Sequence, residues 1–145
     1  MAVRVQVTFD CADPARLAAF WAKALGYITP DPPPGHATWQ DWLQAMGVPE
    51  DQWNARNAIE DPDGVGPRIF FQQVPEGKVV KNRLHLDVNV SGGRSVPLEE
   101  RVKRVDSTAQ RLCAEGATLV GPHPPEPDHY SVTMLDIEGN EFCLQ

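Results

Sequence analysis

One short segment places two residues of catalytic types on the same face of a predicted strand. The sequence LHLDVNV at 84–90 alternates apolar and polar residues, so His85 and Asp87 share the polar face. An imidazole with an ordinary pKa of about 6.5 suits both proton transfer and metal binding, and the nearby carboxylate can orient the ring. His85 and Asp87 are therefore candidate catalytic residues. The alternative is a cleft histidine held only by hydrogen bonds.

Four further polar side chains have a comparable placement on predicted strands. Gln6 and Thr8 lie on the polar face of the opening VRVQVTFD, and Gln72 lies in a later strand. Their amide and hydroxyl groups are candidate contacts for an oxygenated ligand. Cys143 alternates with apolar neighbours near the end of the sequence, where its thiol is a soft ligand or a small buried residue. Redox or thiol chemistry at Cys143 is the least favoured interpretation, because it requires a lowered thiol pKa and only His85 is an obvious nearby group that could carry the positive charge needed to lower it.

Aromatic residues form a second group of candidate ligand contacts. Trp39 and Trp42 have helical spacing after Thr38, which can cap a short helix. That spacing favours packing in a core or a flap, and an aromatic wall for a planar ligand is the alternative. Phe70, in a predicted strand, and Tyr130, beside the predicted cleft, complete the group.

The segments that would position these residues carry clear boundary signals. Asp13, Pro14 and Gly26 predict the N-cap, the first helical position and the end of a helix. A second helix is predicted over 97–115, with Cys113 among its inward-facing residues. Strands are predicted over the ranges 3–10, 27–29, 57–60, 68–74, 84–90, 117–120, 131–135 and 141–145.

The two halves of the chain, about 1–80 and 81–145, repeat the order strand, helix, strand, strand, strand. Each helix ends at a glycine, and each half places D-x-[DE]-G before its last strand, at 61–64 and 136–139. Repeated order with repeated turns indicates an internal duplication. We therefore predict a single α+β domain over 1–145, in which two βαβββ modules form a curved mixed sheet with helices outside and a polar cleft inside.

Three segments, together with the duplication, resemble the vicinal oxygen chelate superfamily. They are DPARLAAFW at 13–21, KNRLHLDV at 81–88 and DIEGNEFCL at 136–144. More narrowly, they are similar to its glyoxalase-like and bleomycin-resistance-like small proteins, over essentially the whole chain. The resemblance implies the glyoxalase/bleomycin resistance/dihydroxybiphenyl dioxygenase fold. It leaves the reaction open, because the superfamily includes lyases, isomerases, dioxygenases and metal-free drug-binding proteins.

The resemblance also implies a place for a metal ion. Members that bind one take ligands from four strand positions, which fall here on Gln6, Gln72, His85 and Cys143. Cys143 stands where the superfamily's metal enzymes usually have a carboxylate. Two amides, an imidazole and a thiol suit a hard cation poorly, and the Cys and His favour zinc. A divalent ion, with zinc preferred, is therefore an expectation beside that of a metal-free site.

The overall charge and the cysteines limit the partners and the compartment. The net charge of -7, without a run of basic residues, argues against nucleic acid and anionic membrane surfaces. Three cysteines without a close pair, and no long apolar run, predict a cytoplasmic protein with free thiols. A homodimer is compatible with the resemblance, and nothing in the sequence decides it.

These observations favour a glyoxalase-like protein that binds a small oxygenated molecule in a polar cleft. Proton transfer would make it a lyase or an isomerase. The alternative is metal-free binding of a drug or a metabolite, as in the bleomycin-resistance-like proteins. The sequence leaves open whether the protein is an enzyme.

Overall fold

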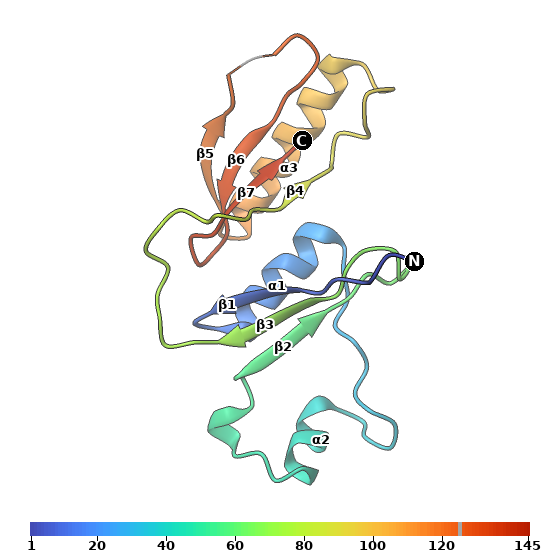
Figure 1. Ribbon diagram of the computed structural model, residues 1–145, viewed down its shortest axis with the longest axis vertical. Coiled ribbons are helices and arrows are strands. Elements are labelled where there is room, and N and C mark those ends of the chain that lie inside the picture. Colours follow the sequence, from blue (N-terminus) through green and yellow to red (C-terminus); the bar gives the residue numbers. More distant parts are fainter. Residues whose placement is uncertain (125) are drawn as a thin grey trace. The chain divides into compact units, whose positions relative to one another are not determined.

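The chain divides into two units, Met1–Gly77 and Lys78–Gln145. Figure 1 shows a computed structural model of the chain, and the structure describes residues 1–124 and 126–145. Each unit has a sheet with a helix packed against it.

The first unit contains a three-stranded mixed sheet in the order β1-β3-β2, formed by β1 (Val7–Cys11), β2 (Arg56–Ile59) and β3 (Ile69–Gln73). Strand β1 runs parallel to β3, and β2 runs antiparallel to it. Helix α1 (Pro14–Leu25) packs against β2 and β3. The Phe9 ring lies 5.3 Å from Trp21 and 5.5 Å from Phe71, so an aromatic cluster joins the helix to the sheet.

The predicted boundaries of α1 are confirmed. The Asp13 side chain accepts a hydrogen bond from the backbone N–H of Arg16, and Pro14 occupies the first helical position. Gly26 ends the helix at φ 71°, a conformation that other residues adopt only with strain. The buried face of α1 carries Leu17, Ala18, Phe20, Trp21 and Ala24.

Two predicted strands of this unit are shorter than expected. Strand β1 begins only at Val7, and the side chains of Val3 and Val5 are exposed. The last pairing contact is the hydrogen bond from the backbone N–H of Val7 to the carbonyl of Arg68, and β3 begins at the next residue, Ile69. The strand predicted at 27–29 is reduced to a single bridge between Ile28 and Glu60.

The tryptophan-rich segment forms α2 (Trp39–Ala45), followed by the short 3₁₀ helix η1 (Glu50–Gln52). Thr38 caps α2 as predicted, in a capping box with Asp41. None of the residues of α2 is buried, and Trp39 and Trp42 meet edge to face with ring centres 5.6 Å apart. Of the two expected placements, packing in a core is therefore wrong for the residues described, and packing in a flap stays a prediction.

The second unit consists of β4 (Asp87–Val88), α3 (Leu98–Ala114), β5 (Thr118–Pro122), β6 (Val132–Leu135) and β7 (Glu141–Leu144). Its sheet has the order β4-β7-β6-β5, with β4 parallel to β7 and the other neighbours antiparallel. Helix α3 packs against β5, β6 and β7. This unit thus has the predicted βαβββ order (Figure 1).

Strand β4 is much shorter than the predicted strand over 84–90. Backbone hydrogen bonds still join this segment to β7, from Cys143 to Leu86 and from Gln145 to Val88. Leu84, which the alternation places on the apolar face of the strand, is exposed. The pairing therefore begins about two residues later than the alternation suggests.

Helix α3 differs from its predicted pattern at two residues. Cys113, expected to face inward, is exposed. Arg101 is buried instead, and its guanidinium donates hydrogen bonds to the carbonyl oxygens of Val96 and Asp128 and to the Asp128 carboxylate. A pattern based on hydropathy misses this residue because its charge is neutralised by partners from distant loops. The predicted α+β class is nevertheless confirmed, with mixed sheets and three α-helices in the described residues. In the same residues, no helix has the length and hydropathy needed to cross a membrane.

Candidate functional site

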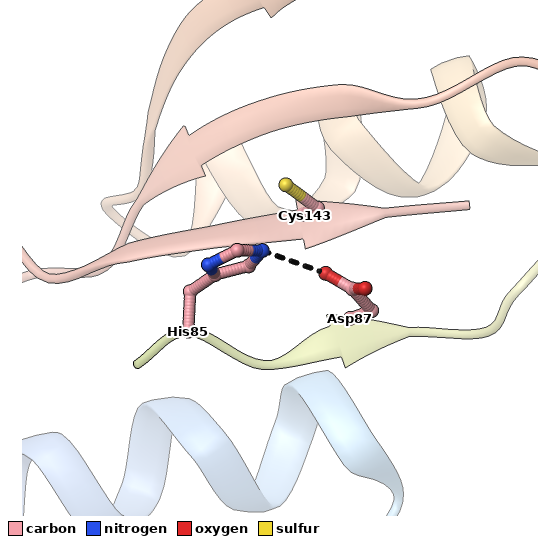
Figure 2. Close-up of side chains that lie close together, drawn as sticks. All are labelled: His85, Asp87 and Cys143. Atoms are coloured by element: carbon pink, nitrogen blue, oxygen red, sulfur yellow. Dashed lines mark ion pairs between the residues drawn. The ribbon is translucent and has the colours of Figure 1, made fainter. Parts of the chain in front are cut away.

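His85 and Asp87 form a pair on the surface of the second unit. Nε2 of His85 lies 3.2 Å from Oδ1 of Asp87, and the two side chains are 42% and 47% exposed. Figure 2 shows the imidazole and the carboxylate facing each other along the β4 segment. The contact expected from strand spacing is therefore present. Because both groups are open to water, the pair contributes little to stability, and its value lies in orienting the ring.

Cys143 lies beside this pair on the neighbouring strand. It is the register partner of Asp87 across β4 and β7, and of Thr133 across β7 and β6. One ligand atom from each of His85, Asp87 and Cys143 lies within 4.8 Å of the other two (Figure 2). Only 9% of Cys143 is exposed, and its Sγ also lies 3.8 Å from the Thr133 hydroxyl.

Two carboxylates around β7 hold Cys143 in place. The Asp136 carboxylate, in the turn before β7, accepts backbone hydrogen bonds from Glu138 and Asn140. At the start of the strand, the Glu141 carboxylate accepts a hydrogen bond from the N–H of Asn82 and pairs with Lys78 at 3.2 Å. The Asn82 N–H, then the backbone N–H of Glu141 itself and then Lys78 lower the pKa of Glu141 to about 2. The segment before His85 is thereby fastened to the strand that carries Cys143.

His123 is a site residue that the sequence analysis missed. It follows β5, and its Nε2 lies 2.8 Å from the Thr133 hydroxyl and 3.7 Å from Sγ of Cys143. The ring is exposed and lies in a loop between prolines, as is usual for a histidine in such a segment. No local signal reveals its contact with the thiol, because only the pairing of β5, β6 and β7 places the two side chains together.

These side chains line a hollow of about 190 Å³ in the second unit. The eight residues that line it are all polar or titratable: three histidines, two acids, one cysteine and two neutral polar residues. They are His85, His123, His129, Asp87, Glu126, Cys143, Ser131 and Gln145. No lysine or arginine is among them. A site of this composition favours cations and hydrogen-bonding oxygenated molecules over anions.

Tyr130, a predicted ligand contact, does not line this hollow. Its hydroxyl donates a hydrogen bond of 2.7 Å to Asp106 on α3. Burial, reinforced by the Asp106 carboxylate, raises the pKa of Tyr130 to about 12. The tyrosine thus fastens a loop to the helix in the structure described.

The remaining predicted contacts belong to the first unit, and those on its sheet lie on the face away from α1. Thr8 and Phe70 are register partners, and the Arg68 guanidinium lies 5.5 Å from the centre of the Phe70 ring. Trp39 and Trp42 belong to the same unit but to helix α2. Gln6 and Gln72 also lie on this sheet face, and they decide whether the implied four-residue metal set fits.

The two amides are poorly suited to bind one cation. Gln72 is the register partner of Asp10, which places Gln6 four residues away along the strands, a separation of about 13 Å. Oε1 of Gln6, its only cation-binding atom, accepts a hydrogen bond of 2.6 Å from the Arg68 guanidinium. The Gln72 amide donates to the Asp10 carboxylate. The first unit thus supplies a positive charge where the implied set needs a ligand, and we derive no chemistry from that set.

A comparison with protein families identifies the chain. The family model described as "Glyoxalase-like domain" matches residues 6–145. The chain belongs to the glyoxalase-like family. The predicted resemblance to the vicinal oxygen chelate superfamily is thereby confirmed, while the reaction remains open because the fold hosts many.

Solved structures of other proteins are similar in fold to the glyoxalase-like chain. A glyoxalase/bleomycin resistance protein/dioxygenase family enzyme from Burkholderia phytofirmans is 18% identical, covering 96% of this chain and 94% of that one, with a TM-score of 0.61. A possible glyoxalase from Bacillus cereus is 17% identical, covering 100% and 99%, with a TM-score of 0.59. At this identity the likeness establishes the fold alone.

A third neighbour contains a metal. It is a mutant of the fosfomycin resistance protein FosX from Listeria monocytogenes, in complex with manganese(II) and 1S,2S-dihydroxypropylphosphonic acid. It is 13% identical, covers 100% of this chain and 90% of that one, and has a TM-score of 0.62. No curated protein matches the sequence.

Proposed function

We propose that this glyoxalase-like protein binds a small oxygenated molecule in the hollow of the second unit and acts on it by proton transfer, as a lyase or an isomerase. The observation that carries the proposal is the His85–Asp87 pair on the wall of that hollow. The FosX neighbour, whose structure contains a small dihydroxylated molecule, supports an oxygenated ligand, although the phosphonate group of that molecule has no lysine or arginine counterpart among the residues that line this hollow.

The chemistry follows from the pair. A neutral imidazole takes a proton from a carbon next to a carbonyl group, and the Asp87 carboxylate stabilises the imidazolium that forms. The same ring then returns the proton to the enolate, either at the original carbon or at a neighbouring atom. Side-chain donors of the hollow, such as Ser131 and Gln145, can hold the oxygen on which negative charge develops.

The test is hydrogen exchange on a panel of small hydroxyketones and dicarbonyls. The full chain is incubated with each compound in D₂O, and loss of the C–H signal is followed by proton NMR. We expect exchange with at least one compound, reduced about 100-fold or more in His85→Ala. His36→Ala, in the first unit, is the matched control and should keep the wild-type rate. A panel without exchange, or a His85→Ala variant with full exchange, would overturn the proposal.

A second candidate function is metal-free binding of a planar drug or metabolite without conversion. One observation favours it: Trp39 and Trp42 are partly exposed on a helix in which no residue is buried. Quenching of tryptophan fluorescence by a bound, chemically unchanged compound would support this function. Unchanged affinity in Trp42→Ala would count against it, with Trp53→Phe as control, since the Trp53 indole is held by the carbonyl of Val48.

The cytoplasmic location and the homodimer also remain predictions. Fractionation of the producing cells tests the first. Light scattering of the purified chain across a concentration series tests the second, and a constant monomer mass would contradict it.

A further inference from the structure

We propose that the first unit carries an anion site, in which the Arg68 guanidinium binds the carboxylate or phosphate group of a small molecule. The site lies on the sheet face where the family resemblance implies two metal ligands, Gln6 and Gln72, and its ligand has the opposite charge. It uses no residue of the hollow in the second unit and does not rest on the proposed function.

Two contacts hold the Arg68 guanidinium against the sheet. Strands β1 and β3 lie side by side (Figure 1), so Arg68, directly before β3, reaches the Gln6 amide, directly before β1. Nη1 of Arg68 donates a hydrogen bond of 2.6 Å to Oε1 of Gln6, and the guanidinium lies 5.5 Å from the centre of the Phe70 ring. Because the amide and the ring already restrict this side chain, it loses little further freedom when it binds a ligand.

The positive charge of Arg68 is not compensated by a carboxylate. Its side chain is exposed and its hydrogen-bond partner, the Gln6 amide, is neutral; no ion pair of the described residues includes Arg68. Other cations of the chain do pair with carboxylates, among them Lys78, Arg101, Lys103 and Arg104. In a chain with a net charge of -7, this guanidinium therefore creates a local attraction for an anion.

The acidic residues of this sheet oppose that attraction only weakly. Asp10 is the register partner of Gln72, four residues along the strand from Arg68, which is about 13 Å. Its carboxylate already accepts a hydrogen bond from the Gln72 amide. Glu60 directly follows β2, and no ion pair joins it to Arg68 in the structure described. An anion at Arg68 therefore displaces water and not a carboxylate of the chain.

The groups around Arg68 are hydrogen-bond donors. Arginine has no acceptor atom, so the Gln6 amide must turn its oxygen toward Arg68, and its NH₂ group remains available to donate. Thr8, two residues from Gln6 on the same face, adds a hydroxyl donor. The N–H groups of the guanidinium that are not bonded to Gln6 can bind two oxygens of one carboxylate or phosphate. This surface thus suits an anion and not the divalent ion that the resemblance implies.

The test follows the binding of three simple anions at a known place in the chain. The full chain, labelled with ¹⁵N, is titrated with inorganic phosphate, acetate and benzoate at constant ionic strength, and its backbone amide and arginine Nε–H signals are followed by NMR. We expect saturable shifts at Arg68, Gln6 and Phe70 with at least one anion. The anion that binds most tightly assigns the ligand class, phosphate or carboxylate. Shifts that do not saturate, or that spare these residues, would overturn the inference.

Variants distinguish a defined site from general electrostatic attraction. Arg68→Ala should weaken binding of the preferred anion about 10-fold or more, and Arg68→Lys should lie between, because it keeps the charge but loses the planar pair of donors. The matched control is Arg56→Ala, which removes an equal charge from the same sheet face about 13 Å along the strands and should change the affinity less than about 3-fold. Both arginines are exposed, so the fold should persist, and the NMR spectrum of each variant reports it. Equal losses in Arg68→Ala and Arg56→Ala would overturn the site.

Gln6→Glu separates the anion site from the implied metal set. The introduced carboxylate should pair with Arg68 and abolish anion binding, whereas at a metal-ligand position it should strengthen the binding of zinc(II), which is titrated in parallel. Gln44→Glu, on α2, adds the same charge elsewhere in the first unit and should bind the anion normally. Unchanged anion binding in Gln6→Glu, or zinc-induced shifts at Gln6 that grow in this variant, would overturn the inference.

His85→Ala, in the second unit, distinguishes this site from the proposed function. It should bind the anion as the wild type does, while it loses hydrogen exchange. Loss of anion binding in His85→Ala would contradict a site that belongs to the first unit alone.

Discussion

The D-x-[DE]-G turns at 61–64 and 136–139 differ in how deeply their first aspartate is buried, and this difference predicts how much each turn contributes to the stability of the fold. Oδ1 of Asp136 accepts the backbone N–H groups of Glu138 and Asn140 at 2.9 and 3.0 Å, and both carboxylate oxygens also accept the Asn140 amide. Asp136 is only 3% exposed. Asp61, in the matching turn, accepts three backbone N–H groups but remains accessible to water.

Replacing Asp136 with alanine removes the acceptor of two backbone donors and of one amide. Bonds to a charged acceptor contribute about 1–2 kcal/mol each when the unpaired donor is partly shielded from water, so the two backbone donors alone predict a loss of about 2–4 kcal/mol. In a chain of this length the melting temperature should fall by about 10 °C. Asp61→Ala should cost less, because water replaces the lost acceptor in an open turn.

The assay is urea unfolding followed by circular dichroism, for wild type, Asp136→Ala, Asp136→Asn and Asp61→Ala. The midpoint should fall most in Asp136→Ala and by an intermediate amount in Asp136→Asn, whose carbonyl oxygen still accepts the backbone donors. The slope with urea should stay constant. Equal losses for Asp136→Ala and Asp61→Ala would refute the claim that burial decides the value of these hydrogen bonds.

Three further predictions concern stability. Arg101→Ala should lower the free energy of unfolding by about 2–4 kcal/mol, because the carbonyl of Val96 and the carbonyl and carboxylate of Asp128 lose a buried donor. A thermal melting curve checks this, and an unchanged melting temperature would contradict it. Gly116→Ala should cost about 1–3 kcal/mol in chemical denaturation, since φ is 105° and the new Cβ would lie 3.1 Å from Ile137. The N–H groups of Gly66 and then Asp63 lower the pKa of Asp61 below its ordinary 3.8. The ionised Asp61 therefore stabilises the folded chain above pH 3.8, and this contribution is lost as the pH falls through the lowered pKa. Asp61→Asn should make the free energy of unfolding depend less on pH in this acid range, and an acid-unfolding profile identical to that of the wild type would exclude the effect.

The sequence predicted the helices better than the strand ends. Asp13 and Gly26 mark α1 because capping uses groups within one turn of the helix. The strand predicted from residue 3 begins at Val7, because a strand continues only as far as its neighbour does. Arg101 was missed for a related reason, since the groups that neutralise it are distant in sequence.

Local patterns therefore determined the βαβββ order of the second unit, the glyoxalase-like resemblance and the pairing of His85 with Asp87, because each depends on neighbours or spacings within a short segment. Only the tertiary structure brought His123 to Cys143, and only it placed the Arg68 guanidinium on Gln6. Those contacts depend on which strands pair and in what register, and register is set by the summed packing of the whole sheet rather than by any one segment.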